Sequence, residues 1–151
     1  MFKTVKFRGR LTTVFALLCA GVFVAACFFS LRSGTDTVKI GGDDYPVTVS
    51  GEADVIGFLN DLGYSAEKIF EREVTVPEIP NEVYSRYIEM QKKSGFSLGS
   101  HLGEPATLSV YKTADSEQYI NILTANGRII AAHISPMNGS GEMRALTENE
   151  K

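Results

Sequence analysis

The stretch 118-QYINILTANGRIIAAHIS-135 decides the fold of this chain. Its two halves, 118–125 and 128–135, are rich in β-branched residues that favour strands, and the dipeptide Asn126-Gly127 separates them. Asn-Gly is the strongest short-range hairpin signal, because both residues tolerate the positive φ of a type I′ turn. A two-residue turn also fixes which residues of the two strands lie opposite each other. The expected pairs are Ala125 with Arg128, Leu123 with Ile130, and Ile120 with His133.

The residues before this hairpin predict two helices and additional strands. An apolar stripe over 52–62 precedes Gly63, which is typical of a helix that stops in the left-handed conformation. A second helix is expected over 82–94, capped by Asn81 at its start. The expected strands are 45–49, 71–76 and 107–112. These elements predict an α+β fold in which two helices pack on one face of an antiparallel sheet of three to five strands.

An uncharged apolar segment at 11–31 precedes the predicted domain. As a helix, its 21 residues would measure about 31 Å, which matches a bilayer hydrocarbon core of about 30 Å. Four basic residues precede the segment, whereas Arg32 is the only basic residue immediately behind it. Because Lys and Arg are enriched on the cytoplasmic side, this asymmetry predicts one N-terminal transmembrane helix, with a cytoplasmic N-terminus and an extracytoplasmic C-terminal domain.

The end of the apolar segment leaves two further interpretations open. Residues 24–27, with the sequence VAAC, resemble the lipobox of bacterial lipoproteins, in which Cys27 would become the lipid-modified N-terminus of the mature chain. Ordinary signal-peptide cleavage after Ala26 is the other alternative. Phe28 and Phe29 extend the apolar run past Cys27, which favours an uncleaved anchor. All three interpretations place the domain on the same side of the membrane.

Composition divides the chain into five parts. We expect a basic cytoplasmic N-terminus at 1–10, a transmembrane helix or signal anchor at 11–31, a stalk rich in Gly, Thr and Asp at 32–51, the extracytoplasmic domain at 52–146 and a tail at 147–151. All 18 acidic residues follow Arg32, together with ten basic ones, so this portion carries a net charge of −8. That charge disfavours nucleic acid and anionic lipid as ligands of the domain.

The predicted domain is poor in side chains that carry catalysis or hold metals. Both cysteines, Cys19 and Cys27, fall in the apolar segment, so no thiol nucleophile, disulfide or cysteine metal site is expected outside it. His101 and His133 are too few for a typical zinc site, and we expect a structural role for His133. Ser100 and His101 could centre a small hydrolase, but the Gly-x-Ser-x-Gly order is missing around them. We therefore predict a domain that is not an enzyme and uses neither cofactor nor metal.

Several short motifs follow one another along the domain. They are FLNDLGY at 58–64, VTVP at 74–77, GFSL at 95–98 and NGRII at 126–130. In this order they resemble the bacterial family known as domain of unknown function 4830, over Val55 to about Leu146. The resemblance implies an uncharacterised domain behind an N-terminal anchor, found mainly in Firmicutes. It implies no catalytic residue, because no activity is assigned to the family.

These observations predict a single-pass, membrane-anchored extracytoplasmic domain that acts as a protein- or peptide-interaction module. We expect an open sheet edge or the loop 99–103 to contact the partner. The alternatives are a lipoprotein anchored at Cys27 that carries the same domain, an accessory subunit of a larger membrane complex, and a small cell-surface hydrolase.

Overall fold

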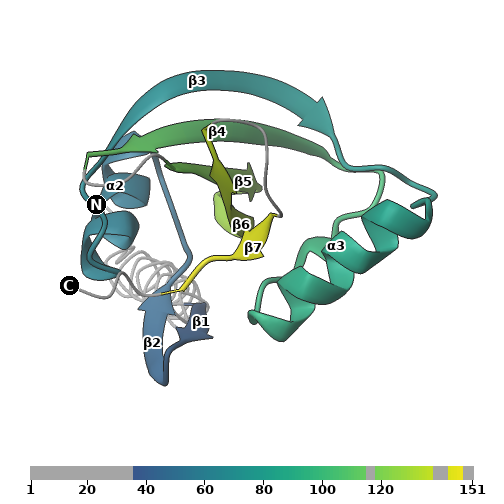
Figure 1. Ribbon diagram of the computed structural model, residues 1–151. Coiled ribbons are helices and arrows are strands. Elements are labelled where there is room, and N and C mark those ends of the chain that lie inside the picture. Colours follow the sequence, from purple (N-terminus) through teal and green to yellow (C-terminus); the bar gives the residue numbers. More distant parts are fainter. Residues whose placement is uncertain (1–35, 115–117, 138–142, 148–151) are drawn as a thin grey trace, which may run out of the picture. The chain divides into compact units, whose positions relative to one another are not determined.

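The computed structural model describes residues 36–114, 118–137 and 143–147 (Figure 1). Its elements are β1 (Thr37–Ile40), β2 (Asp43–Pro46), α2 (Glu52–Asp61), β3 (Ala66–Thr75), α3 (Glu82–Lys93), the 3-10 helix η1 (Leu98–Ser100), β4 (Pro105–Thr113), β5 (Gln118–Ala125), β6 (Arg128–Pro136) and β7 (Arg144–Ala145). Strands β1 and β2 form a small antiparallel sheet, and the second sheet has the order β3-β4-β5-β6-β7. The predicted α+β class with an antiparallel sheet is confirmed.

The predicted N-terminal anchor lies outside the described residues. This applies to the segments 1–10 and 11–31, including Cys27, and to the tail beyond 147. In the part of the chain that the structure describes, no helix is long and apolar enough to cross a bilayer. The anchor and the alternative lipid attachment at Cys27 therefore stay predictions.

Strands β5 and β6 form the hairpin that the sequence predicts. Asn126 and Gly127 both adopt positive φ angles, 51° and 72°, as a type I′ turn requires. Ala125 lies opposite Arg128, as expected. The two turn residues therefore determine the pairing of the strands next to the turn.

A β-bulge changes the register farther from the turn, so two of the three expected pairs are wrong. The pairing shifts between Leu123 and Thr124, which leaves Ile130 as the extra residue on β6. Because a bulge turns two consecutive side chains toward one face, Ile130 and Ala131 both enter the same apolar cluster. The observed pairs are Leu123 with Ala131 and Ile120 with Ile134.

Helices α2 and α3 pack on opposite faces of the five-stranded sheet, so the prediction that both lie on one face is wrong. On β5, Ile122 belongs to the apolar cluster that contains Phe58 of α2, whereas its neighbour Leu123 belongs to the cluster that Tyr87 of α3 covers. Successive residues of a strand point to opposite faces. Every residue of β6 from Ile129 to Ile134 is buried, so both of its faces need a covering layer.

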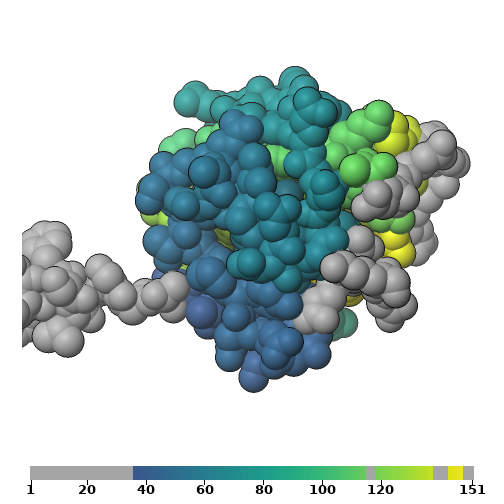
Figure 2. Space-filling view, turned by 90° about the vertical axis from the view of Figure 1, so that its left-hand side faces the viewer, coloured from purple at the N-terminus to yellow at the C-terminus, as the bar shows by residue number. Residues whose placement is uncertain are grey.

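The predicted stalk at 32–51 is wrong where the structure describes it, because four of its residues belong to the core. Its buried residues are at most 8% exposed and share a cluster with α2: Val38, Ile40, Val47 and Val49. Figure 2 shows this segment and α2, both in blue, as one continuous surface. β1 also approaches the end of α3, since a Cβ on Gly95 would lie 2.8 Å from a methyl group of Val38. The described residues 36–51 therefore belong to the same compact unit as α2.

The start of α3 and the end of α2 follow local signals that the sequence predicts. Asn81 caps α3, because its Oδ1 accepts a hydrogen bond of 2.8 Å from the backbone N–H of Tyr84. After α2, Gly63 adopts a φ of 84°, and the N–H of Tyr64 donates to the carbonyl of Leu59 at 2.9 Å. This pattern is the left-handed helix stop in which the following residues bond back to the last turn.

The two edges of the larger sheet differ. The outer edge of β6 is covered by residues 47–49, which form two backbone hydrogen bonds of 2.8 Å with 127–129, and by β7. Between these pieces, the fully buried amide of Gln91 donates to the carbonyl of Ala132 at 3.1 Å and accepts from its N–H at 2.9 Å. At the opposite edge, no strand of the described chain lies beyond β3 (Figure 1).

Candidate functional site

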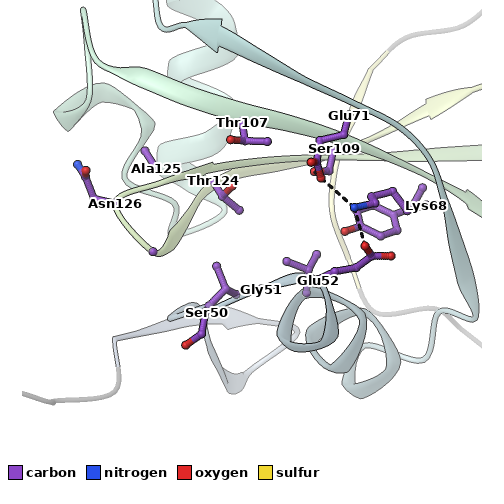
Figure 3. Close-up of a pocket in the computed structure, with 14 residues that line it drawn as sticks. Ser50, Gly51, Glu52, Lys68, Glu71, Thr107, Ser109, Thr124, Ala125 and Asn126 are labelled. Carbon is purple, nitrogen blue, oxygen red and sulfur yellow. Dashed lines mark hydrogen bonds and ion pairs between the residues drawn. The ribbon is translucent and has the colours of Figure 1, made fainter.

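A pocket of about 400 Å³ lies on the sheet face that α2 covers (Figure 3). Four parts of the chain line it: the segment 49–55, β3, β4 and the β5–β6 hairpin. The lining side chains that carry its chemistry are Glu52, Lys68, Glu71, Thr107, Ser109 and Thr124. The pocket combines charged groups at one side with hydroxyl groups along its floor.

A lysine between two carboxylates forms the charged side of the pocket. Lys68 Nζ lies 2.5 Å from an oxygen of Glu52 and 2.9 Å from Oε2 of Glu71. The Oγ of Ser109 also donates to Oε2 of Glu71, at 3.2 Å. These hydrogen bonds raise the pKa of Lys68 and lower that of Glu71, so both groups of this pair are ionised near neutral pH. The cluster thus carries a net charge of −1.

Hydroxyl side chains on neighbouring strands form the floor. Thr107 on β4 lies directly opposite Thr124 on β5, and Ser109 follows two residues later on the same face of β4. Tyr111 comes next on this face, and it is buried in the core beneath α2. The floor therefore changes from polar near the β5–β6 turn to apolar toward the centre of the sheet.

Backbone groups near the start of α2 form the rim. The N-cap residue of α2 is Gly51, which has no side chain that could accept a capping hydrogen bond. The N–H of Ser50, just before it, donates to Oδ2 of Asp54 at 2.6 Å. The N–H of Val49 is held by the carbonyl of Gly127 at 2.8 Å. This bond ties the start of α2 to the β5–β6 turn, so the rim is fixed by the sheet.

The chemistry of the lining groups suits binding. A lysine that stays protonated is not a nucleophile, and an ionised carboxylate paired with it is a poor general acid at neutral pH. The ion pairs, hydroxyl groups and backbone groups can instead donate and accept hydrogen bonds to a polar ligand. Within the described part of the chain, no group of three or more potential metal ligands occurs.

The structure does not pair Ser100 with His101, the two residues of the predicted alternative hydrolase. Both ring nitrogens of His101 face other partners: Nδ1 lies 2.8 Å from Oε2 of Glu104, and Nε2 lies 3.4 Å from Oγ of Ser97. Glu104 also accepts from the amide of Asn126 at 3.2 Å. This network connects the loop 97–104 to the β5–β6 turn and places His101 between a hydroxyl group and a carboxylate.

His133 lies in the interior between α3 and the sheet. Its Nδ1 and the hydroxyl of Tyr87 form a hydrogen bond of 2.9 Å, and the two rings meet edge to face with centroids 5.3 Å apart. Burial lowers the pKa of His133 to about 4. The expected packing of His133 within the fold is confirmed.

The burial of His133 makes the stability of the domain depend on pH. The folded protein resists protonation down to about pH 4, whereas the unfolded chain takes up the proton near pH 6.5. The free energy of unfolding should therefore fall as the pH is lowered from 6.5 to 4, by about 3 kcal/mol. Urea denaturation of the wild type and of His133→Gln over this range measures the effect. The variant should lose less stability on acidification, and equal losses would contradict the assignment.

Comparisons with known proteins leave the fold and the pocket without a relative. No family model, no curated protein and no solved structure matches this chain. The resemblance to the domain-of-unknown-function family 4830 therefore stays a prediction.

None of the charged residues that line the pocket is among the predicted site residues. Glu71 is the first residue of the predicted strand 71–76, and Lys68 lies before it, although both belong to β3. The available signal was the spacing of Lys68 and Glu71, but on a regular strand residues three apart point to opposite faces. A second bulge, between Lys68 and Phe70, brings the two side chains to the same face.

Proposed function

We propose that the chain is a single-pass, membrane-anchored protein whose extracytoplasmic domain binds a protein or peptide. The uncharged segment 11–31 and the basic residues before it support the anchor and its orientation. The Cys27 lipoprotein remains the alternative form of attachment. We also propose that the domain is not an enzyme, because the groups that line the pocket are suited to binding a polar ligand.

The pocket is the proposed binding site, and its charge is the observation that carries this proposal. Glu52 and Glu71 supply two negative charges, but Lys68 supplies one positive charge. The portion after Arg32, which contains the pocket, is also acidic, with a net charge of −8. Opposite charges steer and orient partners. We therefore expect the partner to place a Lys, an Arg or a free amino terminus against Glu52 and Glu71.

Selection of random nonapeptides on the full chain in detergent tests the binding proposal. Enriched peptides should contain Lys or Arg, and their affinity should fall about fivefold in Glu52→Gln, because a solvent-accessible ion pair contributes about 1 kcal/mol. Glu89→Gln is the matched control, since it removes the same charge from an exposed position on α3. Enriched peptides without basic residues, or equal affinity for both variants, would refute the proposed site.

Protease treatment of intact cells tests the proposed location. Protease added outside cells that carry the chain should digest the domain, while the N-terminal peptide stays in the membrane fraction. A domain that becomes accessible only after lysis would refute the proposed orientation. Cys27→Ala separates the two forms of attachment, because only a lipoprotein depends on that thiol.

A further inference from the structure

Strand β3 leaves one edge of the larger sheet open. Every residue from Ile69 to Glu73 is exposed, including Ile69 at 49% and Phe70 at 48%. Exposed sheet edges present unpaired N–H and C=O groups to which another strand can add. In Figure 1, β3 forms the upper border of the sheet over its whole length.

The sequence of β3 is complementary to itself in antiparallel pairing. The six residues 67-EKIFER-72 have their midpoint between Ile69 and Phe70. Pairing about this midpoint places Glu67 opposite Arg72 of the partner subunit, Lys68 opposite Glu71 of the partner subunit, and Ile69 opposite Phe70 of the partner subunit. Each pair occurs twice by symmetry, so the seam contains four ion pairs and two apolar pairs.

We propose that two copies of this chain associate through β3 as an antiparallel pair about this midpoint, which joins the two five-stranded sheets into one. The proposal goes beyond the pocket and does not rest on it. A two-fold axis perpendicular to the sheet relates the two copies, so each interface patch meets an identical one. Such an axis keeps each face of the sheet on the same side, and paired side chains must therefore share a face.

The faces of the paired residues agree throughout the hexapeptide. Lys68 and Glu71 lie opposite Tyr111 and Ser109 of β4, on the face of the pocket. The other four residues lie on the face of α3. Phe70 and Arg72 are opposite Val110 and Leu108, Glu67 is opposite Lys112, and the bulge turns Ile69 toward the side of Phe70.

The bulge is part of this complementarity. On a regular strand Ile69 and Phe70 would point to opposite faces, and neither could meet its counterpart across the midpoint. With the bulge, Ile69 and Phe70 of both copies gather on one face at the centre of the seam. The guanidinium of Arg72, which lies 5.9 Å from the centre of the Phe70 ring, then flanks this apolar centre.

Charge reversal on the α3 face tests the pairing without touching the pocket. In full-length chains in detergent, light scattering should report a dimer for the wild type. Arg72→Glu and Glu67→Arg each place like charges opposite each other twice, so each variant alone should dimerise about tenfold more weakly or worse. A mixture of the two variants should form a dimer again, because every Glu then faces an Arg. Recovery on mixing also shows that both variants are folded.

One control variant and three contrary outcomes complete the test of the proposed dimer. Glu89→Lys, which reverses a charge on the exposed side of α3, should dimerise like the wild type. A monomeric wild type at its highest soluble concentration overturns the proposal. A dimer that persists in Arg72→Glu overturns it as well, because the contact then lies elsewhere. Variants that stay monomeric when mixed overturn the proposed register. Peptide binding by Arg72→Glu tests the pocket separately, because this substitution leaves Glu52, Lys68 and Glu71 unchanged.

Discussion

A fragment that begins at Glu52 is expected not to fold, although the charge and turn pattern of the chain places the domain boundary there. Such a fragment lacks Val38, Ile40, Val47 and Val49, all of which are buried in the core cluster that also contains residues of α2. Full burial of such side chains contributes about 1.5–3 kcal/mol each, so roughly 6–12 kcal/mol is lost. That is as large as the whole stability of an ordinary domain, about 5–15 kcal/mol. Circular dichroism and urea denaturation measure the result against a fragment that begins at Thr35.

A point substitution in the full chain separates this effect from truncation itself. Val47→Asp places a charge at a position that is 1% exposed and should cost more than about 4 kcal/mol. Thr48→Asp makes a similar change at the exposed neighbouring residue and should have little effect. A fragment from Glu52 with a cooperative unfolding transition, or equal effects of the two substitutions, would show that the segment is dispensable.

Gln91→Ala is expected to destabilise the domain by roughly 2–6 kcal/mol. The substitution leaves both the N–H and the C=O of Ala132 without their partner in a buried site, at about 1–3 kcal/mol for each group. Chemical denaturation gives the difference in unfolding free energy. Lys92→Ala, at the next and exposed position of α3, should change stability by less than about 0.5 kcal/mol.

Gln91→Glu gives a sharper version of the same test. A neutral glutamic acid can both donate to and accept from Ala132, as the amide does, but the ionised form cannot donate. Burial raises the pKa of such a carboxyl, so the folded variant binds its proton more tightly than the unfolded chain does. The deficit relative to the wild type should thus grow as the pH rises from 5 to 8. A deficit that does not change with pH would show that Gln91 contributes by packing alone.

The elements that the sequence predicted correctly are those that neighbouring residues determine. The cap at Asn81, the helix stop at Gly63 and the turn at Asn126-Gly127 each depend on a few adjacent residues, and each is present. The predicted register is wrong beyond the turn, because β6 contains a bulge there. The bulge lets Ile130 and Ala131 pack in the same apolar cluster, which depends on residues distant in sequence.

The predicted placement of both helices on one face of the sheet is also wrong. The run from 129 to 134 is apolar at nearly every position, which is the pattern of a strand covered on both faces. That pattern, taken alone, contradicts two helices on a single face. The prediction of a stalk rested on the Gly and Asp content of 32–51. The spacing of the valines and the isoleucine in this segment is the pattern that corresponds to their burial.

The candidate site could not be predicted because no local motif encodes it. Lys68, Glu52 and Ser109 come from three elements that meet only after the sheet has formed. Lys68 and Glu71 share a face only because of the β3 bulge. Sequence spacing therefore gave no indication of the charge cluster.

The amide of Gln91 and its neighbours along β6 also limit how large an assembly can become. With residues 47–49, this side chain and β7 covering that edge, a further strand has no row of unpaired backbone groups to continue from. In the larger sheet of the described chain, only the β3 edge is left for strand addition, and the proposed partner occupies its residues 67–72. Growth of the sheet is thus expected to stop at two copies, because neither end of the joined sheet offers a template for a filament.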